Sequence, residues 1–178
     1  MQRLTIAHES WPIAGSFTIS RGSKTTAEVV VVTMERDGVK GRGECVPYRH
    51  YGETIEAVMA ALTDRRKEIE RGIGHEEIPA LLQTKAAQNA LDCALWDLEA
   101  KQAGKRIWQL FDVPPAKPLI TAFTLSLDTV DNMTAAAAGA AGRPLLKLKL
   151  GADDDAERLR AVRRAAPRTR LIVDANEG

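Results

Sequence analysis

Two lysines and an aspartate at the ends of predicted strands are the residues whose types and spacing suggest chemistry. Lys147 and Lys149 alternate with leucines in residues 145–150, and Asp174 ends the apolar run that begins at Leu171. Because alternate residues of a strand face opposite sides, both lysines share one face. Charged side chains are costly to bury unless another group pairs with them. The pattern therefore predicts a site at the carboxyl ends of the strands, where α/β enzymes hold their reactive groups.

The spacing of the lysine pair is suited to proton transfer. A lysine has an ordinary pKa of about 10.4 and is a poor base at neutral pH. The Cα atoms of residues two apart on a strand are roughly 6–7 Å apart. At that separation two ammonium groups repel each other by about 2–3 kcal/mol at an effective dielectric constant of about 20. This repulsion favours the release of one proton, which would leave a usable base. The alternative interpretation is an edge strand whose solvated lysines deter aggregation.

The composition excludes several classes of protein. The chain has 178 residues, with 25 Lys and Arg against 24 Asp and Glu and a net charge of +1. This balance gives no strong positive electrostatic field that would attract nucleic acid or an anionic membrane. No apolar run approaches the roughly 20 residues that span a bilayer. We therefore expect no nucleic-acid partner and no membrane association. The first residues lack the apolar core of a signal peptide, and two cysteines make no disulfide framework, so a cytoplasmic protein is expected.

The elements that hold the lysines and Asp174 alternate between strand and helix. The expected order is a strand at 119–127, a helix at 128–141, a strand at 145–150, a helix at 153–166 and a strand at 171–176. Strand–helix–strand units of this kind form parallel sheets. A proline cluster at residues 114–118 precedes them, so the sequence predicts one domain at 1–117 and a second at 118–178.

The first domain combines an antiparallel meander with helices. Strands are expected at residues 3–10, 27–35 and 39–45, with a hairpin turn at Asp37-Gly38. Gly41 and Gly43 in the third strand indicate a bulge or the close approach of another backbone. The predicted helices of this domain cover residues 54–70, 76–82 and 85–102.

The helix at 85–102 has the strongest apolar stripe in the chain. Cys93 is expected to lie on that stripe as a reduced, buried thiol. Asp92 and Asp97 are expected to be structural residues of the same helix, hydrogen-bonded or solvated.

The second domain is short for the fold that its pattern begins. Its β-α-β-α-β order continues naturally into a (β/α)8 barrel or a doubly wound sheet, and a closed barrel needs about 250 residues. Three parallel strands alone leave open edges and uncovered apolar faces. We therefore expect the chain to be part of a longer protein or its first ordered part.

Several motifs, taken together and in order, resemble the enolase superfamily. The resemblance covers all 178 residues. Within the superfamily, the chain is most similar to the muconate-lactonising-enzyme subgroup and its dipeptide epimerases acting on L-Ala-D/L-Glu. The motifs are Trp11-Pro12, the segment Ile19-Ser20-Arg21-Gly22-Ser23, Gly43-Glu44-Cys45-Val46-Pro47-Tyr48, the helix Ala90-Leu91-Asp92-Cys93-Ala94-Leu95-Trp96-Asp97-Leu98, the Lys147-Leu148-Lys149 strand and Asp174-Ala175-Asn176.

The resemblance implies an α+β capping domain followed by the first part of a (β/α)8 barrel. It implies that Lys149 is a general base and that Asp174 is the first of three carboxylate ligands of Mg²⁺, with the other ligands and an opposing lysine beyond residue 178. The implied reaction removes the proton next to a carboxylate in a small-molecule substrate, with Lys147 tuning the base. Mg²⁺ prefers hard carboxylate oxygens, which suits an aspartate.

Three further residues are candidates for substrate binding. Thr124, at the end of the first strand of the second domain, is expected to face the same site, although an ordinary strand threonine is an equal alternative. Arg21 and Lys24 belong to residues 13–26, a polar, glycine-containing stretch that is predicted as a functional loop. They could bind a distal carboxylate such as a glutamyl side chain, and a solvated loop pair is the alternative.

The sequence thus predicts an isomerase, an Mg²⁺-dependent epimerase of a dipeptide such as L-Ala-D/L-Glu. A cycloisomerase or an o-succinylbenzoate synthase of the same subgroup shares the lysine pair and the metal. A non-catalytic binding module is the alternative from another class. A homo-oligomer is left open.

Overall fold

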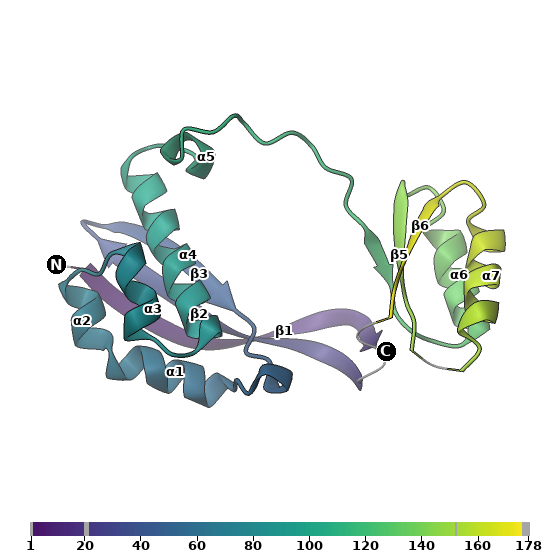
Figure 1. Cartoon of the computed structure of the whole chain (residues 1–178), viewed down its shortest axis with the longest axis horizontal. Helices are drawn as coiled ribbons and strands as arrows, with labels where there is room; N and C mark the ends of the chain where they lie inside the picture. Colours follow the sequence, from purple (N-terminus) through teal and green to yellow (C-terminus); the bar gives the residue numbers. More distant parts are fainter. Residues whose placement is uncertain (1, 20–21, 152, 176–178) are drawn as a thin grey trace. The chain divides into compact units, whose positions relative to one another are not determined.

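The computed structural model describes residues 2–19, 22–151 and 153–175 (Figure 1). These residues form two compact units, which are described separately. The first unit contains the residues up to Trp11 together with Thr26–Ala116, and the second contains Pro12–Thr25 together with the residues from Lys117 onward. The predicted division into domains 1–117 and 118–178 stays a prediction.

The antiparallel sheet has the order β1-β2-β3, with β1 at Gln2–Ile19, β2 at Gly22–Arg36 and β3 at Val39–Cys45. Strands β2 and β3 pair antiparallel from Arg36 opposite Val39 to Val30 opposite Cys45. The turn between them is Asp37-Gly38, and both residues have positive φ angles, 53° and 79°. Two such residues give the type of tight turn that follows the twist of a hairpin. The predicted meander and its turn are confirmed.

The prediction of a long loop at residues 13–26 is wrong. Strand β1 continues to Ile19 and β2 begins at Gly22, so the described part of this stretch is the tip of a β-hairpin. The stretch lacks an apolar alternation because its arms are largely exposed. Its backbone groups pair across the hairpin instead, which stabilises strands without a buried face.

The helices of the first unit are short except for one. A predicted continuous helix at 54–70 is interrupted at Arg65, where the backbone has φ −100° and ψ 10°. Just before the break, the hydroxyl of Thr63 donates to the carbonyl of Met59 at 2.7 Å, a bond of the kind that bends helices. The helical elements are η1 Arg49–Tyr51, α1 Ile55–Asp64, α2 Arg66–Arg71, η2 His75–Glu77, α3 Ile78–Leu81, α4 Lys85–Gln102 and α5 Ile107–Leu110.

Helix α4 packs directly on β3, because β3 carries glycines where the two backbones meet. A Cβ atom at Gly43 would lie 2.1 Å from the carbonyl oxygen of Ala90, and one at Gly41 would lie 2.2 Å from that of Ala94. These distances leave no room for a methyl group. The predicted close approach of another backbone is confirmed.

Polar side chains of α4 also satisfy the backbone of the edge strand β3. The amide N–H of Arg42 donates to Asp97 Oδ2 at 2.8 Å, and the ammonium of Lys101 donates to the Lys40 carbonyl at 3.0 Å and to Asp97 at 2.6 Å. Desolvation raises the pKa of Asp97, but the bonds from Lys101 and from the Arg42 N–H together lower it below its ordinary value. Asp97 is structural, as predicted.

The second unit contains a parallel sheet in the order β4-β5-β6. Its elements are β4 Phe123–Leu125, α6 Val130–Gly139, β5 Leu145–Lys149, α7 Asp155–Ala165 and β6 Arg170–Asp174. Strand β4 is shorter than the predicted 119–127. Helix α6 is capped by Thr129, whose hydroxyl accepts from the N–H of Asn132. The alternation of strand and helix confirms the predicted β-α-β-α-β order.

Within the described ranges, helices cover only one face of the parallel sheet. Helices α6 and α7 lie on the same side of β5 and β6 (Figure 1). Leu125, Leu146 and Leu148 form the core of this unit with residues of the two helices. Because side chains alternate along a strand, the residues between these leucines face the other side of the sheet. Among the described residues of the whole chain, no helix has the length and apolarity needed to cross a membrane.

The prediction that Cys93 is buried is wrong. Cys93 is exposed because it lies beside the apolar stripe of α4, whereas Cys45 at the end of β3 is buried. Desolvation raises the pKa of Cys45 to about 11 and also raises the pKa of Cys93.

We expect Gly43→Ala to lower the free energy of unfolding by about 2 kcal/mol or more, because the strand and helix backbones must separate to admit the methyl group. Denaturant titration measures this change. The matched control is Gly139→Ala in α6, where nothing lies within 4 Å of the added Cβ and no positive φ is present. A Gly43→Ala protein as stable as the wild type would contradict the close packing of α4 on β3.

Iodoacetamide at pH 8 should modify Cys93 at least about tenfold faster than Cys45. A thiol with a pKa of about 11 holds only about 0.1% thiolate at that pH, and it is also shielded. Peptide mass spectrometry gives both rates, and unfolding in denaturant should make them similar. Equal rates in the folded protein would show that Cys45 reaches solvent.

Candidate active site

The two lysines and the aspartate meet on the uncovered face of the parallel sheet. The register places Lys149 opposite Asp174 and Lys147 opposite Ile172, so all four side chains point to one side. Oδ2 of Asp174 lies 2.7 Å from Nζ of Lys147 and 2.9 Å from Nζ of Lys149. The carboxylate thus binds both ammonium groups and offsets the mutual repulsion that their spacing alone predicts.

Burial differs along this row of charges. The side chain of Lys149 is 11% exposed, against 33% for Lys147 and 29% for Asp174. Strand β5 is the central strand of the sheet, so the alternative of an edge strand with solvated lysines is wrong. A nearly buried ammonium group at the carboxyl end of a central strand requires pairing, and Asp174 of the neighbouring strand provides it.

The other predicted site residues lie on other strands or outside the described residues. Thr124 is opposite Lys147 in the β4–β5 register, so its side chain faces the lysine side of the sheet. Lys24 is an exposed residue of β2 in the hairpin tip. Arg21 lies outside the described residues.

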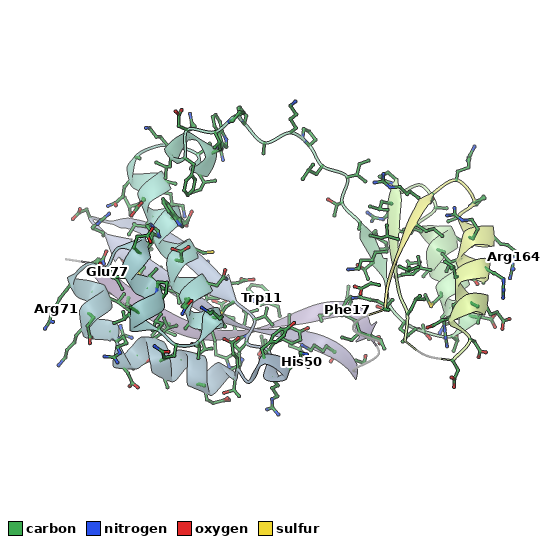
Figure 2. All side chains as sticks on the ribbon, viewed as in Figure 1. Trp11, Phe17, His50, Arg71, Glu77 and Arg164 are labelled. Carbon is green, nitrogen blue, oxygen red and sulfur yellow. The ribbon has the colours of Figure 1, made fainter. Side chains whose placement is uncertain are left out.

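An aromatic residue that the sequence analysis missed lies against Lys149. The ring of Phe17, at the hairpin tip and labelled in Figure 2, has its centroid 5.9 Å from the Lys149 ammonium. This distance is within the range of a cation–π contact. The only sequence signal was an isolated aromatic residue in a polar stretch, which was predicted as a loop.

The donor set fits a hard divalent cation only in part. The carboxylate of Asp174 is an oxygen ligand of the type that Mg²⁺ prefers. Within the described ranges, no three His, Cys, Asp or Glu side chains come together as a metal site. Asp174 can therefore serve as one ligand, and the described residues do not provide a full set.

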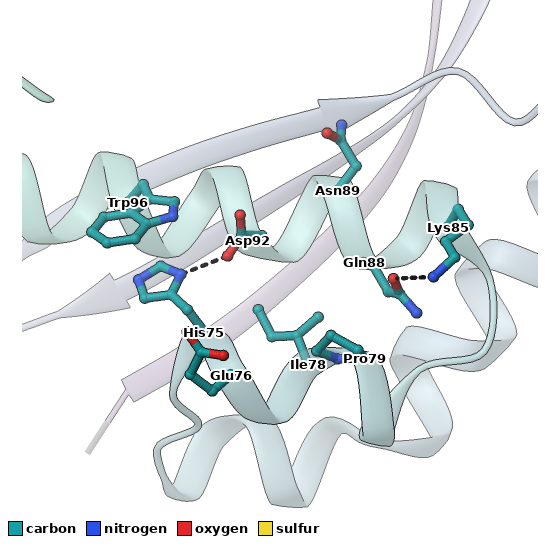
Figure 3. A pocket seen from close by; sticks show the side chains of 9 residues that line it. All are labelled: His75, Glu76, Ile78, Pro79, Lys85, Gln88, Asn89, Asp92 and Trp96. Atoms are coloured by element: carbon teal, nitrogen blue, oxygen red, sulfur yellow. Dashed lines mark hydrogen bonds and ion pairs between the residues drawn. The ribbon is translucent and has the colours of Figure 1, made fainter. Parts of the chain in front are cut away.

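The first unit has a concave surface of its own, between α4 and the segment of η2 and α3 (Figure 3). His75 closes one end, with its ring stacked on Trp96 at a centroid distance of 3.7 Å. Its Nδ1 lies 2.5 Å from Oδ1 of Asp92. These contacts attach the segment at residue 75 to α4, so Asp92 is structural, as predicted. The residues that line this groove include no pair of neighbouring lysines.

Comparison with known proteins shows what this chain is similar to. The model of the mandelate racemase/muconate lactonizing enzyme N-terminal domain matches residues 1–111. L-Ala-D/L-Glu epimerase of Escherichia coli K12 is 42% identical over 179 residues, which cover 99% of this chain and 56% of the relative. The chain thus spans about half the length of the curated relatives that it matches.

Two solved structures show the same similarity. An enolase family member of Agrobacterium tumefaciens with homology to dipeptide epimerases, with bound sodium and L-Ala-L-Glu, is 50% identical with a TM-score of 0.94, covering 100% of this chain and 55% of its own. The dipeptide epimerase of Cytophaga hutchinsonii, complexed with Mg and D-Ala-L-Val, is 27% identical with a TM-score of 0.88, covering 100% of this chain and 52% of its own.

Asp174→Asn should lower the free energy of unfolding by about 1–3 kcal/mol, because two ammonium groups lose a charged hydrogen-bond acceptor. The change is measured by chemical denaturation of the variant and the wild type. Asp131→Asn, in the exposed first turn of α6, is the control and should cost about 1 kcal/mol or less. An Asp174→Asn protein of unchanged or higher stability would show that the lysines do not depend on this carboxylate.

Proposed function

The chain belongs to the mandelate racemase/muconate lactonizing enzyme family of the enolase superfamily, and we propose that it acts in an Mg²⁺-dependent dipeptide epimerase. The proposed substrate is a dipeptide such as L-Ala-D/L-Glu, whose α-carbon next to the terminal carboxylate is inverted. The observation that carries the proposal is the juxtaposition of Lys147, Lys149 and Asp174 on the open face of the parallel sheet. The epimerase activity of the similar proteins supports it.

Lys149 is the proposed base. Its Nζ takes the proton from the substrate α-carbon, and its low exposure limits competition from water for that proton. For this step the amine must be neutral, so Lys149 gives up one ammonium proton before it takes the α-proton. Lys147 is the more exposed of the two, so its ammonium is suited to contact the substrate carboxylate.

Asp174 is the proposed first ligand of Mg²⁺, and the other ligands are not among the described residues. When bound, Mg²⁺ would supply positive charge that stabilises the developing negative charge on the carboxylate oxygens of the substrate. Magnesium in the structure of the similar epimerase from Cytophaga hutchinsonii supports this assignment. Thr124 is a proposed hydrogen-bond partner of the substrate, because it shares the face of Lys147.

Lys24 and Arg21 are proposed to bind the distal carboxylate of a glutamyl side chain. The hairpin tip that carries Lys24 belongs to the same compact unit as the lysine site. An exposed ammonium group on that tip can pair with an anionic side chain while it stays in contact with water.

Deuterium incorporation from D2O into a panel of dipeptides, with and without Mg²⁺, tests the function. The proposal requires Mg²⁺-dependent exchange at the α-carbon of the C-terminal residue, fastest for acidic residues. Exchange without inversion, or turnover of a cyclic substrate instead, would favour another activity of the same subgroup. No metal-dependent exchange with any dipeptide would favour the non-catalytic alternative.

Lys149→Ala should reduce exchange of the α-hydrogen from one face of the substrate by at least about 10³-fold, because a positioned base contributes about 10²–10⁴-fold. Proton NMR of each dipeptide epimer in D2O measures the two faces separately. Lys105→Ala, which removes an exposed lysine outside the site, is the control and should leave both rates unchanged. Undiminished exchange from both faces in Lys149→Ala would exclude this role.

A further inference from the structure

The hairpin tip is fastened to the segment that follows β4 by two hydrogen bonds. The hydroxyl of Ser126 donates to the carbonyl of Ser16 at 3.2 Å. The next residue, Leu127, donates its backbone N–H to the carbonyl of Thr18 at 3.1 Å. Both bonds lie within the second compact unit. The two acceptors flank Phe17, so the residue that contacts Lys149 is held on both sides.

The sequence around the tip is organised for this contact. Gly15, immediately before the fastened residues, has a φ angle of 80° with nothing within 4 Å of an added Cβ, a conformation that favours glycine. Beyond it, the hydroxyls of Thr18 and Ser23 hydrogen-bond at 2.9 Å across the hairpin. The tip therefore has its own internal cross-link, while Ser126 and Leu127 join it to the strand end beside the lysines.

We propose that Ser126 is a positioning residue that holds the hairpin tip so that Phe17 covers the ammonium group of Lys149. Ser126 directly follows β4, the strand that pairs with the lysine strand β5. Fixing the tip there keeps an apolar wall beside the base and spares the substrate the cost of ordering the tip on binding. The effect on catalysis rests on the proposed epimerase function, whereas the covering of Lys149 does not.

Limited acylation of lysines tests the covering without any assay of activity. The protein is treated with trace acetic anhydride, and mass spectrometry compares the labelling of Lys149 with that of the exposed Lys105. Ser126→Ala should raise this ratio about fivefold, the factor that corresponds to the loss of one hydrogen bond. Ser126→Thr keeps the hydroxyl and should restore the wild-type ratio.

Ser10→Ala is the matched control. It removes a hydroxyl of β1, the strand that also carries Phe17, but outside the tip, where it donates to Glu28 of β2 at 2.5 Å. It should leave the labelling of Lys149 unchanged. Circular dichroism of each variant confirms the fold. A ratio in Ser126→Ala equal to that of the wild type would overturn the proposal, and so would an equal rise in Ser126→Ala and Ser126→Thr.

Steady-state kinetics with a dipeptide then tests the effect on the reaction. Ser126→Ala should raise KM about fivefold while kcat changes less than about twofold, because the variant must order the tip when substrate binds. Increased labelling of Lys149 with an unchanged KM would overturn the positioning role in catalysis. If the wild-type protein has no epimerase activity, the proposed function fails, and the acylation ratio still decides whether Ser126 holds the tip.

Discussion

The arrangement of the candidate site depends on a single carboxylate that lies between two ammonium groups. Without Asp174, the two lysines of β5 would repel each other on a face that no helix covers. The parallel register brings the carboxylate to them, because it places Asp174 directly opposite Lys149. A metal that took this carboxylate as a ligand would add positive charge beside both lysines, so the charges of the site are mutually dependent.

The fold supplies this arrangement through two different kinds of packing. In the parallel sheet, leucines pack against α6 and α7 and leave the opposite face to charged residues. In the antiparallel sheet, glycines let α4 contact the backbone of β3, while Asp97 and Lys101 satisfy its edge. The long arms of β1 and β2 then present a tip whose residues belong to the same compact unit as the lysines.

Much of this organisation could be predicted from local patterns. The alternation of lysine with leucine has a period of two, so the shared face of Lys147 and Lys149 follows from strand geometry alone. The strand–helix–strand order predicts that Asp174 ends a neighbouring parallel strand. Asp37-Gly38 and the two glycines of β3 were equally informative, since each reports a backbone requirement that few other residues satisfy.

The rest depends on tertiary contacts that leave little local signal. The hairpin tip carries polar residues because its strands pair with each other over largely exposed arms, and it therefore has the composition of a loop. The position of Phe17 follows from the bonds made by Ser126 and Leu127, which are distant in sequence. Cys93 was assigned to the apolar stripe because it stands between the buried Leu91 and Ala94 in the sequence. Each residue of an α-helix is turned by about 100° from the next, so Cys93 lies beside the stripe instead.

The central claim is that the lysine face of the parallel sheet is where a proton leaves the substrate α-carbon. The most direct measurement is a crystal structure of the protein with Mg²⁺ and a bound dipeptide. The account predicts that Nζ of Lys149 lies within about 3.5 Å of the α-carbon, with Lys147 and Asp174 on the same side of the sheet. A dipeptide bound elsewhere, or lysines directed to opposite faces, would contradict it.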